Sequence, residues 1–214
     1  MTKTGVGFCA ALLVLASGMS VGAAEPVDLQ RTLKGVEDRY NKIQTLQVKF
    51  TEDYTARGRT RSESGTLYLR KKGKMRWEYS SGKLFVSDGK FIFSCYPDEH
   101  RAEKMSMKES DDMKAPLAFL LGDVNFERDF GEYHTKPQDG GMLITALPKS
   151  DKFPYTDVTF LVAGDFVMRR LEVRLQNNDL MTFTFEGEKK NPLLTDALFQ
   201  FTPPKGVELD DLTH

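Results

Sequence analysis

The hydrophobic positions near the start of the chain follow a helical spacing. In "PVDLQRTLKGVEDRYNKIQTL", residues 26–46, apolar side chains recur three or four positions apart and charged side chains occupy the other side. Asp28 precedes the first apolar position and is a residue type that caps helix N-termini. The pattern predicts an amphipathic helix after Asp28, whose apolar stripe is Leu29, Leu33, Val36, Tyr40 and Ile43.

The period then changes to two. Leu46, Val48 and Phe50 alternate with Gln47 and Lys49, as expected for a strand with one buried face. The alternation returns in "SGTLYLR", "KMRWEYS", "KLFVSD", "KFIFSCY", "MLITALP", "YTDVTFLV", "VMRRLEVRL" and "LMTFTFEG". Turn signals such as "KKGK", "SDGK", "QDGG" and "QNND" separate these segments. Because short connections join antiparallel neighbours, the segments predict one large antiparallel sheet.

The middle of the chain, from about Met105 to Tyr133, interrupts this alternation. "APLAFLLGD", residues 115–123, begins near a proline and ends near a glycine, which favours a short helix. The segment is apolar nearly all round, so the helix must press its surface against another element. The fold class we expect is mainly β with helices (α+β), a strongly curved antiparallel sheet with helices over its concave face.

Two strands of this sheet are rich in large apolar residues. They contribute Met75, Trp77 and Tyr79 from one segment and Phe91 and Phe93 from another. Since alternate residues of a strand share a face, we expect both sets on the same face of the sheet. The pattern leaves open whether that face is a filled core or a hollow for a guest.

The first residues of the chain are predicted to be a leader peptide and not part of the folded domain. Lys3 precedes the apolar run "VGFCAALLVLASGMSV", and the small residues Gly22 and Ala24 follow it. The run is short for a membrane span and typical of a secretory signal peptide. We expect residues 1–24 to be a cleaved signal peptide, with cleavage after Ala24 or Ala23, and residues 25–214 to form one exported domain. An uncleaved anchor is the alternative.

Composition excludes several classes of protein. The net charge of the 214-residue chain is −1 at pH 7, so no overall basicity points to nucleic acid. Cys9 lies in the predicted signal peptide, which leaves Cys95 without an internal disulfide partner. Stability must therefore come from packing.

Recognisable catalytic motifs are absent from the sequence. It has no G-x-S-x-G, no P-loop and no histidine pair at zinc spacing. His100, His134 and His214 fall in predicted loops or at the terminus, and Cys95 is expected to be buried as a small hydrophobe. We therefore predict a protein that is not an enzyme and has no catalytic residue, metal or cofactor.

Charged clusters favour ordinary solvated surface. The pairs Asp111–Asp112 and Asp210–Asp211 lie in polar contexts, where adjacent carboxylates usually face water. The run "RKKGK", residues 70–74, is favoured as a charged turn between strands over a phosphate site.

Several segments together resemble one family. "SGTLYLRKKGKMRWEY" and "LFVSDGKFIFSCYPDEHRAEK", residues 64–79 and 84–104, are similar to the periplasmic outer-membrane lipoprotein carrier family, LolA. That family has a glycine-led strand, a basic turn, an aromatic strand, "VSDGK" and a second aromatic strand. "ALFQFTPPKGVELDDL" resembles the family's closing signature, and the likeness spans roughly residues 28–211.

The resemblance implies an unclosed β-barrel with an α-helical lid over a hydrophobic cavity. It also implies a monomeric periplasmic carrier that binds the acyl chains of lipoproteins, without nucleic acid or cofactor. Such a carrier accepts lipoproteins from an inner-membrane ABC transporter and delivers them to an outer-membrane receptor lipoprotein. Two alternatives stay open: a periplasmic lipid-binding or lipoprotein-sensing module on the same fold, and a hydrolase whose site is assembled from distant residues.

The resemblance also implies roles for residues. The acyl-chain cavity would be lined by Leu46, Val48, Phe50, Met75, Trp77, Tyr79, Phe91, Phe93, Met181, Phe183 and Phe185. The lid would consist of Leu117, Phe119, Leu120 and Leu121. The family's lid-holding arginine falls at Lys71, beside Arg70, and these two residues are the latch candidates. Because a lysine offers a point charge rather than a planar fork of donors, the same latch geometry is not expected.

Overall fold

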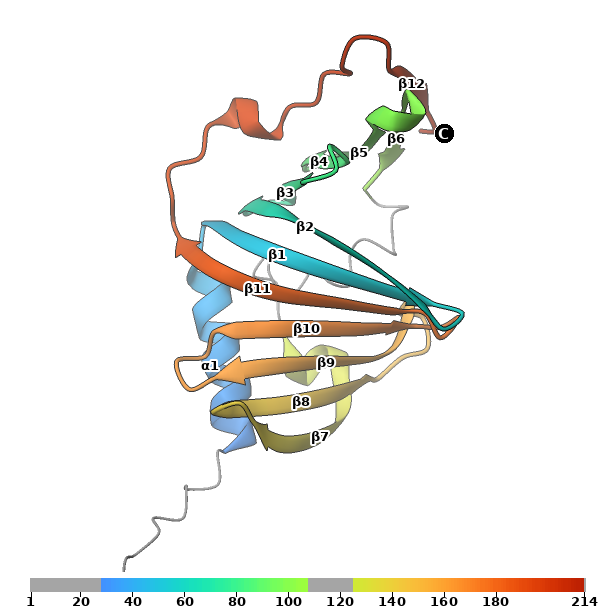
Figure 1. The fold of residues 1–214 in the computed structure, drawn as a ribbon. Helices are drawn as coiled ribbons and strands as arrows, with labels where there is room; N and C mark the ends of the chain where they lie inside the picture. The colour runs from blue at the N-terminus through green and yellow to red at the C-terminus, as the bar shows by residue number, and fades with distance from the viewer. Residues whose placement is uncertain (1–27, 108–124, 214) are drawn as a thin grey trace, which may run out of the picture.

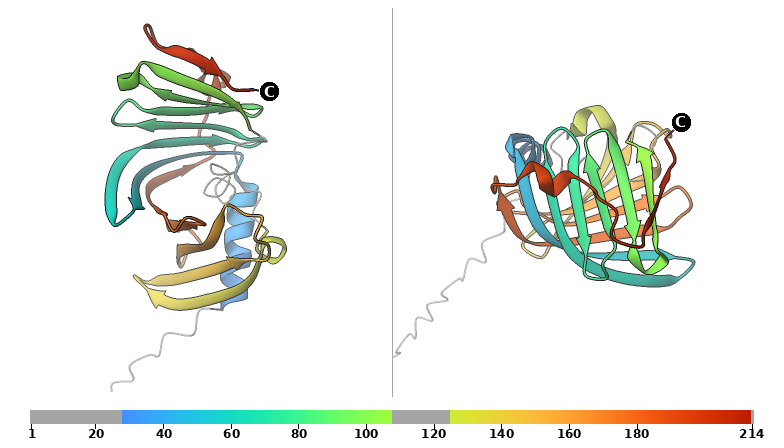
Figure 2. Two further views of the ribbon diagram at one scale, coloured as in Figure 1. Left: turned by 90° about the vertical axis from the view of Figure 1, so that its right-hand side faces the viewer. Right: turned by 90° about the horizontal axis from the view of Figure 1, so that it is seen from above.

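One curved sheet dominates the structure, a computed structural model that describes residues 28–107 and 125–213. Figure 1 shows its strands from one side, and Figure 2 shows the curvature of the sheet and α1 on its concave side. The helices are α1 (Leu29–Lys42) and α3 (Phe126–Asp129), with short 3-10 turns η1 (Pro97–Glu99) and η2 (Asp196–Phe199). The strands are β1 (Thr45–Ala56), β2 (Arg59–Arg70), β3 (Lys74–Tyr79), β4 (Leu84–Asp88), β5 (Phe91–Tyr96), β6 (Arg101–Ser106), β7 (Phe130–Gln138), β8 (Gly141–Pro148), β9 (Tyr155–Ala163), β10 (Met168–Leu175), β11 (Leu180–Lys190) and β12 (Glu208–Asp211).

The strand order runs β12-β6-β5-β4-β3-β2-β1-β11-β10-β9-β8-β7. The neighbours are antiparallel except at one edge, where β12 pairs with β6 in parallel. The fold class is confirmed, but the expectation of purely antiparallel pairing is wrong at this edge. After β11 the chain passes across the sheet to the edge at β6. The last strand, β12, therefore runs in the same direction as β6 beside it (Figure 1).

The first helix forms as its sequence predicts. The Asp28 carboxylate accepts a hydrogen bond from the Gln30 N–H at 2.9 Å, which satisfies one of the free amides of the first turn. Leu33, Val36 and Tyr40 are buried against the sheet. The spacing of the apolar residues therefore sets which face of α1 meets the concave side.

Polar contacts fix α1 on the sheet. The Tyr40 hydroxyl donates to Glu188 of β11 at 2.8 Å and accepts from the Met168 amide of β10 at 3.0 Å. Arg39 forms an ion pair with the same Glu188 carboxylate. Glu37 accepts a hydrogen bond from the Phe126 amide at 2.8 Å, which joins α1 to α3. These bonds attach the helix to β10, β11 and α3 at separate points.

Several elements do not follow the alternating pattern and were not predicted. β6, β7 and β12 carry polar residues on both faces, because edge strands and their neighbours have no fully buried side. The β1–β2 hairpin also extends beyond its predicted ends. Its turn at Arg57 and Gly58 has φ values of 51° and 73°, the left-handed geometry of a tight two-residue hairpin.

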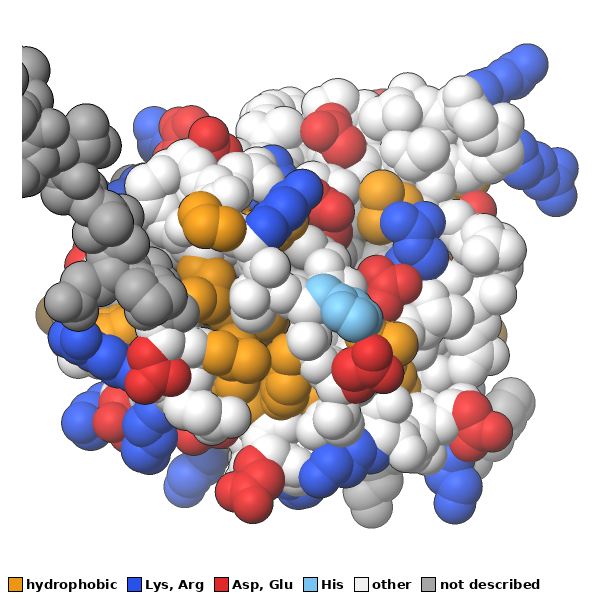
Figure 3. All heavy atoms as spheres, turned by 90° about the horizontal axis from the view of Figure 1, so that it is seen from below, with side chains coloured by type: hydrophobic (Ala, Val, Ile, Leu, Met, Phe, Trp, Pro, Cys, Tyr) orange, Lys and Arg blue, Asp and Glu red, His pale blue; other side chains and the backbone are white. Residues whose placement is uncertain are grey.

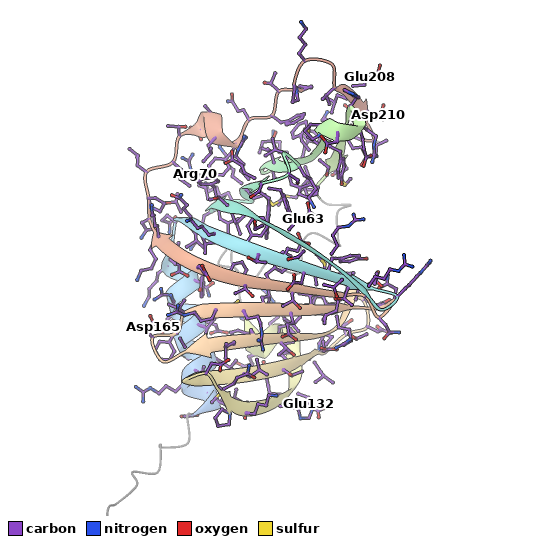
Figure 4. The ribbon with its side chains drawn as sticks, in the orientation of Figure 1. Glu63, Arg70, Glu132, Asp165, Glu208 and Asp210 are labelled. Atoms are coloured by element: carbon purple, nitrogen blue, oxygen red, sulfur yellow. The ribbon has the colours of Figure 1, made fainter. Side chains whose placement is uncertain are left out.

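The C-terminal segment after β11 covers the convex side of β2–β5. Arg70 lies at the end of β2 below this segment (Figure 4), with its guanidinium 5.1 Å from the centre of the Phe199 ring. The Arg76 guanidinium donates to the Leu198 carbonyl at 3.3 Å. The Phe93 and Phe201 rings stack with centroids 5.1 Å apart. The sheet in this region is therefore covered on both faces, which matters for the predicted site.

Candidate functional site

The strands β1, β2, β3 and β11 bring the predicted cavity residues together on the concave face. In the register, Val48 lies opposite Leu67, and Leu67 lies opposite Trp77. Phe50 lies opposite Phe185 on the other side of β1. We call this surface the concave wall, and it consists of Leu46, Val48, Phe50, Leu67, Leu69, Met75, Trp77, Tyr79, Phe183 and Phe185. The half-buried Met181 lies beside it and contacts the same core.

The centre of the concave wall is a cluster of aromatic rings. Phe50 meets Trp77 edge-on at 4.7 Å between centroids and Tyr79 at 5.0 Å. Trp77 lies 5.4 Å from the Phe183 ring, and Phe183 stacks on Phe185 at 6.2 Å. Such pairs are worth about 0.5–1.5 kcal/mol each beyond the area they bury. The wall is thus a closely packed apolar surface.

A glycine allows these rings to approach one another. A Cβ atom on Gly65 of β2 would lie 2.0 Å from the Glu78 carbonyl oxygen and 2.9 Å from the Phe50 ring. Any other residue would push β3 or Phe50 away. Gly65, the glycine that leads "SGTLYLR", therefore has a structural role in shaping the wall.

The concave wall is closed to solvent in this structure. Every residue of the wall is at most 9% exposed, and Met75 and Leu67 are fully buried. A guest could reach the wall only if apolar contacts within the protein were first broken. One polar atom is conspicuous in this surface: the Trp77 indole Nε1 is buried and has no hydrogen-bond partner within the described part of the chain.

One end of the wall is polar. The Tyr79 hydroxyl donates to the buried Glu52 carboxyl at 2.6 Å, and Glu52 lies opposite Glu63 in the β1–β2 register. Lys83 pairs with Glu63 at 2.5 Å, and its ammonium lies 3.8 Å from the centre of the Tyr79 ring. Burial raises the pKa of the Glu52 carboxyl, more than the Tyr79 hydrogen bond lowers it. We call Glu52, Glu63, Tyr79 and Lys83 the polar end.

Two predicted cavity residues lie on the other face. In the β4–β5 register Phe93 lies opposite Val86, whereas Phe85, which shares the face of Trp77, lies opposite Ser94. Phe91 and Phe93 therefore face the convex side, where Phe93 stacks on Phe201 and the Lys104 ammonium lies over Phe91. Their assignment to the cavity is wrong. On the concave side β5 has Ile92, which belongs to the core cluster, together with Ser94 and Tyr96, whose ring lies 6.0 Å from that of Phe85.

The latch candidates contact other parts of the chain. Arg70 forms an ion pair with Asp196 at 2.6 Å and also donates to the Leu194 carbonyl, whereas Lys71 donates to the Asn41 carbonyl at the end of α1. Both thus contact elements next to the wall. The predicted lid residues Leu117, Phe119, Leu120 and Leu121 lie outside the described residues, as does the predicted signal peptide.

The candidate chemical residues are dispersed. Cys95 is buried, as predicted, and faces away from the concave wall, and burial raises the pKa of its thiol. His134 lies in β7 rather than in a loop, but it is exposed, 3.2 Å from Glu132. Asp211 pairs with Lys104 at 2.7 Å, which with contacts from Thr213 lowers the pKa of its carboxyl to about 2. These two ion pairs, at His134 and Asp211, are of the kind found on a solvated protein surface.

A second apolar area lies around the first turns of α1. Figure 3 looks at this end of the molecule and shows apolar side chains framed by charged ones. Two pockets of about 480 and 370 Å³ open there, on either side of the helix. The larger has Leu33, Phe126 and Phe130 among its lining residues, together with Lys34 and Lys149. Neither pocket includes a residue of the concave wall.

Sequence reasoning missed some residues of the site. Leu67 and Leu69 belong to the wall and could have been found from their alternation in "TLYLR". Glu52 continues the alternation of Leu46, Val48 and Phe50, so the sequence pattern predicts a carboxyl group on the buried face of the strand.

Within the described ranges, no helix is long and apolar enough to cross a membrane.

Known proteins resemble this chain over most of its length. The family model of "Outer membrane lipoprotein carrier protein LolA" matches residues 41–202. An outer-membrane lipoprotein carrier protein of Nitrosomonas europaea is 27% identical over 182 residues, which cover 83% of this chain and 87% of that protein. The protein of the same description from Cupriavidus necator is 28% identical over 208 residues, 95% of this chain and 96% of that one.

A solved structure shares the fold. It is an uncharacterized conserved protein from Thermus thermophilus, with a TM-score of 0.51 and 12% identity, covering 85% of this chain and 98% of that one. The family match includes all the strands that carry the concave wall. The chain therefore belongs to the LolA family of outer-membrane lipoprotein carrier proteins.

Proposed function

We propose that this protein binds the acyl chains of lipoproteins on its concave wall and carries them through the periplasm. It accepts them from an inner-membrane ABC transporter and delivers them to an outer-membrane receptor lipoprotein. The observation that carries this proposal is a continuous aromatic and aliphatic wall on an open sheet. Binding of this kind needs no covalent step, so the proposed activity is carriage and not catalysis.

The free energy of burial explains why the wall is covered. Each buried methylene contributes about 0.8 kcal/mol, so one chain of about sixteen carbons represents on the order of 12 kcal/mol. A hollow that captured all of this would hold its cargo too tightly to release it. In this structure the wall is already buried, so a guest must replace contacts that the protein makes with itself.

The predicted lid supplies the competing contacts in this proposal. Leu117, Phe119, Leu120 and Leu121 would cover the wall without cargo, with Lys71 and Arg70 as latch candidates beside it. The net affinity for cargo is then the difference between burying acyl chains and burying the lid. Replacing Leu117 and Leu120 together by glutamate should change acyl-chain binding, and unchanged binding would remove the lid from the proposal.

A release assay tests the carrier function. Spheroplasts that hold newly made lipoprotein are incubated with the purified protein while their transporters are active. We expect lipoprotein in the supernatant as a one-to-one complex with the protein. Lipoprotein that stays on the membrane would overturn the proposal. Mass spectrometry of lipid that copurifies with the protein would reveal instead a carrier or sensor of other lipids.

Two adjacent residues of β11 give a matched pair of variants. Met181 and Thr182 are both half-buried, but Met181 contacts the core of the concave side, whereas Thr182 points to the other face. Met181→Glu places a charge beside the wall and should reduce complex formation strongly. Thr182→Glu adds the same charge at the same point of the chain and should leave complex formation unchanged.

A further inference from the structure

The Trp77 indole N–H is a hydrogen-bond donor without an acceptor. The side chain is 3% exposed, and Nε1 is buried with no partner in the part of the chain that the structure describes. A buried donor left unpaired is costly, which is why such groups are rare in proteins and require an explanation. A phenylalanine would fill much of the same apolar space without this cost. The donor therefore suggests a partner that comes from outside the protein.

The surroundings of Trp77 exclude most acceptors within the wall. Its side chain lies among the Phe50, Phe183 and Tyr79 rings at 4.7, 5.4 and 6.4 Å, and its register partners are Leu67 and Phe85. Among the polar groups on this side, the Tyr79 hydroxyl and the Glu52 carboxyl are bonded to each other, and the buried Ser87 hydroxyl accepts from the Gly89 amide. The indole thus offers one neutral donor within an apolar surface.

The charges at the polar end indicate which kind of chemical group Trp77 can bind. Glu52 and Glu63 set two carboxyl groups against one ammonium, that of Lys83. A carboxylate or phosphate at Trp77 would lie near these carboxyls with no cation of its own. An ester or amide carbonyl is a neutral acceptor, and in an acylated molecule it adjoins the hydrocarbon chain. It matches both the single donor and the apolar wall around it.

We propose that Trp77 Nε1 donates a hydrogen bond to the carbonyl oxygen of an acyl ester or amide in the bound cargo. This inference rests on the proposed binding of acyl chains and adds which chemical group of the cargo the wall recognises. It also gives the cargo a direction. The hydrocarbon lies toward Met75, Leu69 and Leu46, and the polar head of the cargo lies toward Tyr79 and Glu52. The wall therefore distinguishes acyl chains from plain alkyl chains.

The test uses the fact that Trp77 is the only tryptophan of the chain. A tryptophan-requiring expression strain can replace it by benzothienylalanine, in which a sulfur atom stands in place of the indole N–H. The probes are a diacylglycerol and the dialkyl ether of equal chain length, which lacks both carbonyls. We expect the natural protein to bind the ester about fivefold more tightly than the ether, the ratio that one net hydrogen bond gives. The benzothienyl protein should lose this preference and retain its affinity for the ether.

A second measurement does not depend on the substituted protein folding. The single indole resonance of ¹⁵N-labelled natural protein should move downfield with the ester probe and should not show that downfield shift with the ether. Trp77→Phe provides a further protein without the donor and should also bind the two probes equally. An ester preference that persists in the benzothienyl protein or in the Trp77→Phe variant would overturn the role of Trp77 alone. Failure of both probes to bind natural protein would overturn acyl-chain binding itself.

Discussion

Two regions of the sheet both have an apolar concave face, but they differ in what contacts that face. Over β8–β10 the concave side is covered by α1, whose Tyr40 is bonded to Met168 of β10 and, with Arg39, to Glu188 of β11. Over β1–β3 and β11 the concave wall has the cluster of rings at its centre, and the Trp77 donor has no partner in the described chain. The first region is a core fixed by an ion pair, and its buried atom without a partner among the described residues is the charged Arg39 Nε. The second is an apolar surface with one unpaired neutral donor, which suits a site that exchanges partners.

The largest effect should come from the first region. Phe160 is fully buried on β9 and stacks on Phe126 of α3 at 5.3 Å. Phe160→Ala should lower the free energy of unfolding by about 3–5 kcal/mol, measured by denaturant titration, because it leaves a cavity beside α3. Acyl-chain binding by the folded protein should stay unchanged. A loss of binding well below the unfolding transition would show that the two regions are not independent.

The ion pair that holds α1 should matter next. The side chains of Arg39 and Glu188 are 17% and 12% exposed. Glu188→Gln removes the negative charge and leaves the Arg39 cation poorly compensated. It should destabilise the protein by about 2–3 kcal/mol. Glu186→Gln, on the same strand but exposed, is the matched control and should change the free energy of unfolding by less than about 0.5 kcal/mol.

Glu52 tests the polar end of the wall through pH. Burial raises the pKa of its carboxyl above the ordinary value of 4.5, so over the interval above pH 4.5 the folded protein keeps a proton that the unfolded chain releases. The contribution of Glu52 therefore makes stability fall as pH rises through this interval. Glu52→Gln removes that dependence and can still accept the Tyr79 hydrogen bond.

The variant should gain stability over the natural protein as pH rises from 4.5 and keep that gain at neutral pH. Thermal unfolding at several pH values measures the difference. A difference that is constant with pH would mean that Glu52 titrates as an ordinary exposed carboxyl in the folded state.

The two regions also differ in how well the sequence predicts them. The helix α1 follows from its apolar spacing and the Asp28 cap, because a helix with one buried face has a distinct period. Strands β1 and β3 alternate clearly, so the wall residues from Val48 to Trp77 could be placed on one face.

The same reasoning failed where a strand is covered on both sides. In "KFIFSCY" the residues Phe91, Ile92 and Phe93 are all apolar, since Ile92 faces the core and Phe93 faces the C-terminal segment. Periodicity cannot choose a face when both are apolar. The parallel pairing of β12 was equally out of reach, because it depends on the path of the chain across the sheet and not on a local pattern.

The smallest expected effect tests this corrected placement. Phe93 stacks on Phe201 on the convex side, so Phe93→Leu removes one aromatic pair and keeps an apolar side chain of similar size. It should lower the free energy of unfolding by about 0.5–1 kcal/mol and increase hydrogen exchange in the segment around Phe201. Acyl-chain binding should not change, because Phe93 does not face the concave wall.

The conservative Trp77→Phe should have the opposite pair of effects. It should change the preference for acyl esters and leave hydrogen exchange around Phe201 unchanged. If Phe93→Leu weakened acyl binding instead, the convex side of β5 would have to belong to the binding site, and the contrast between the two faces would fail.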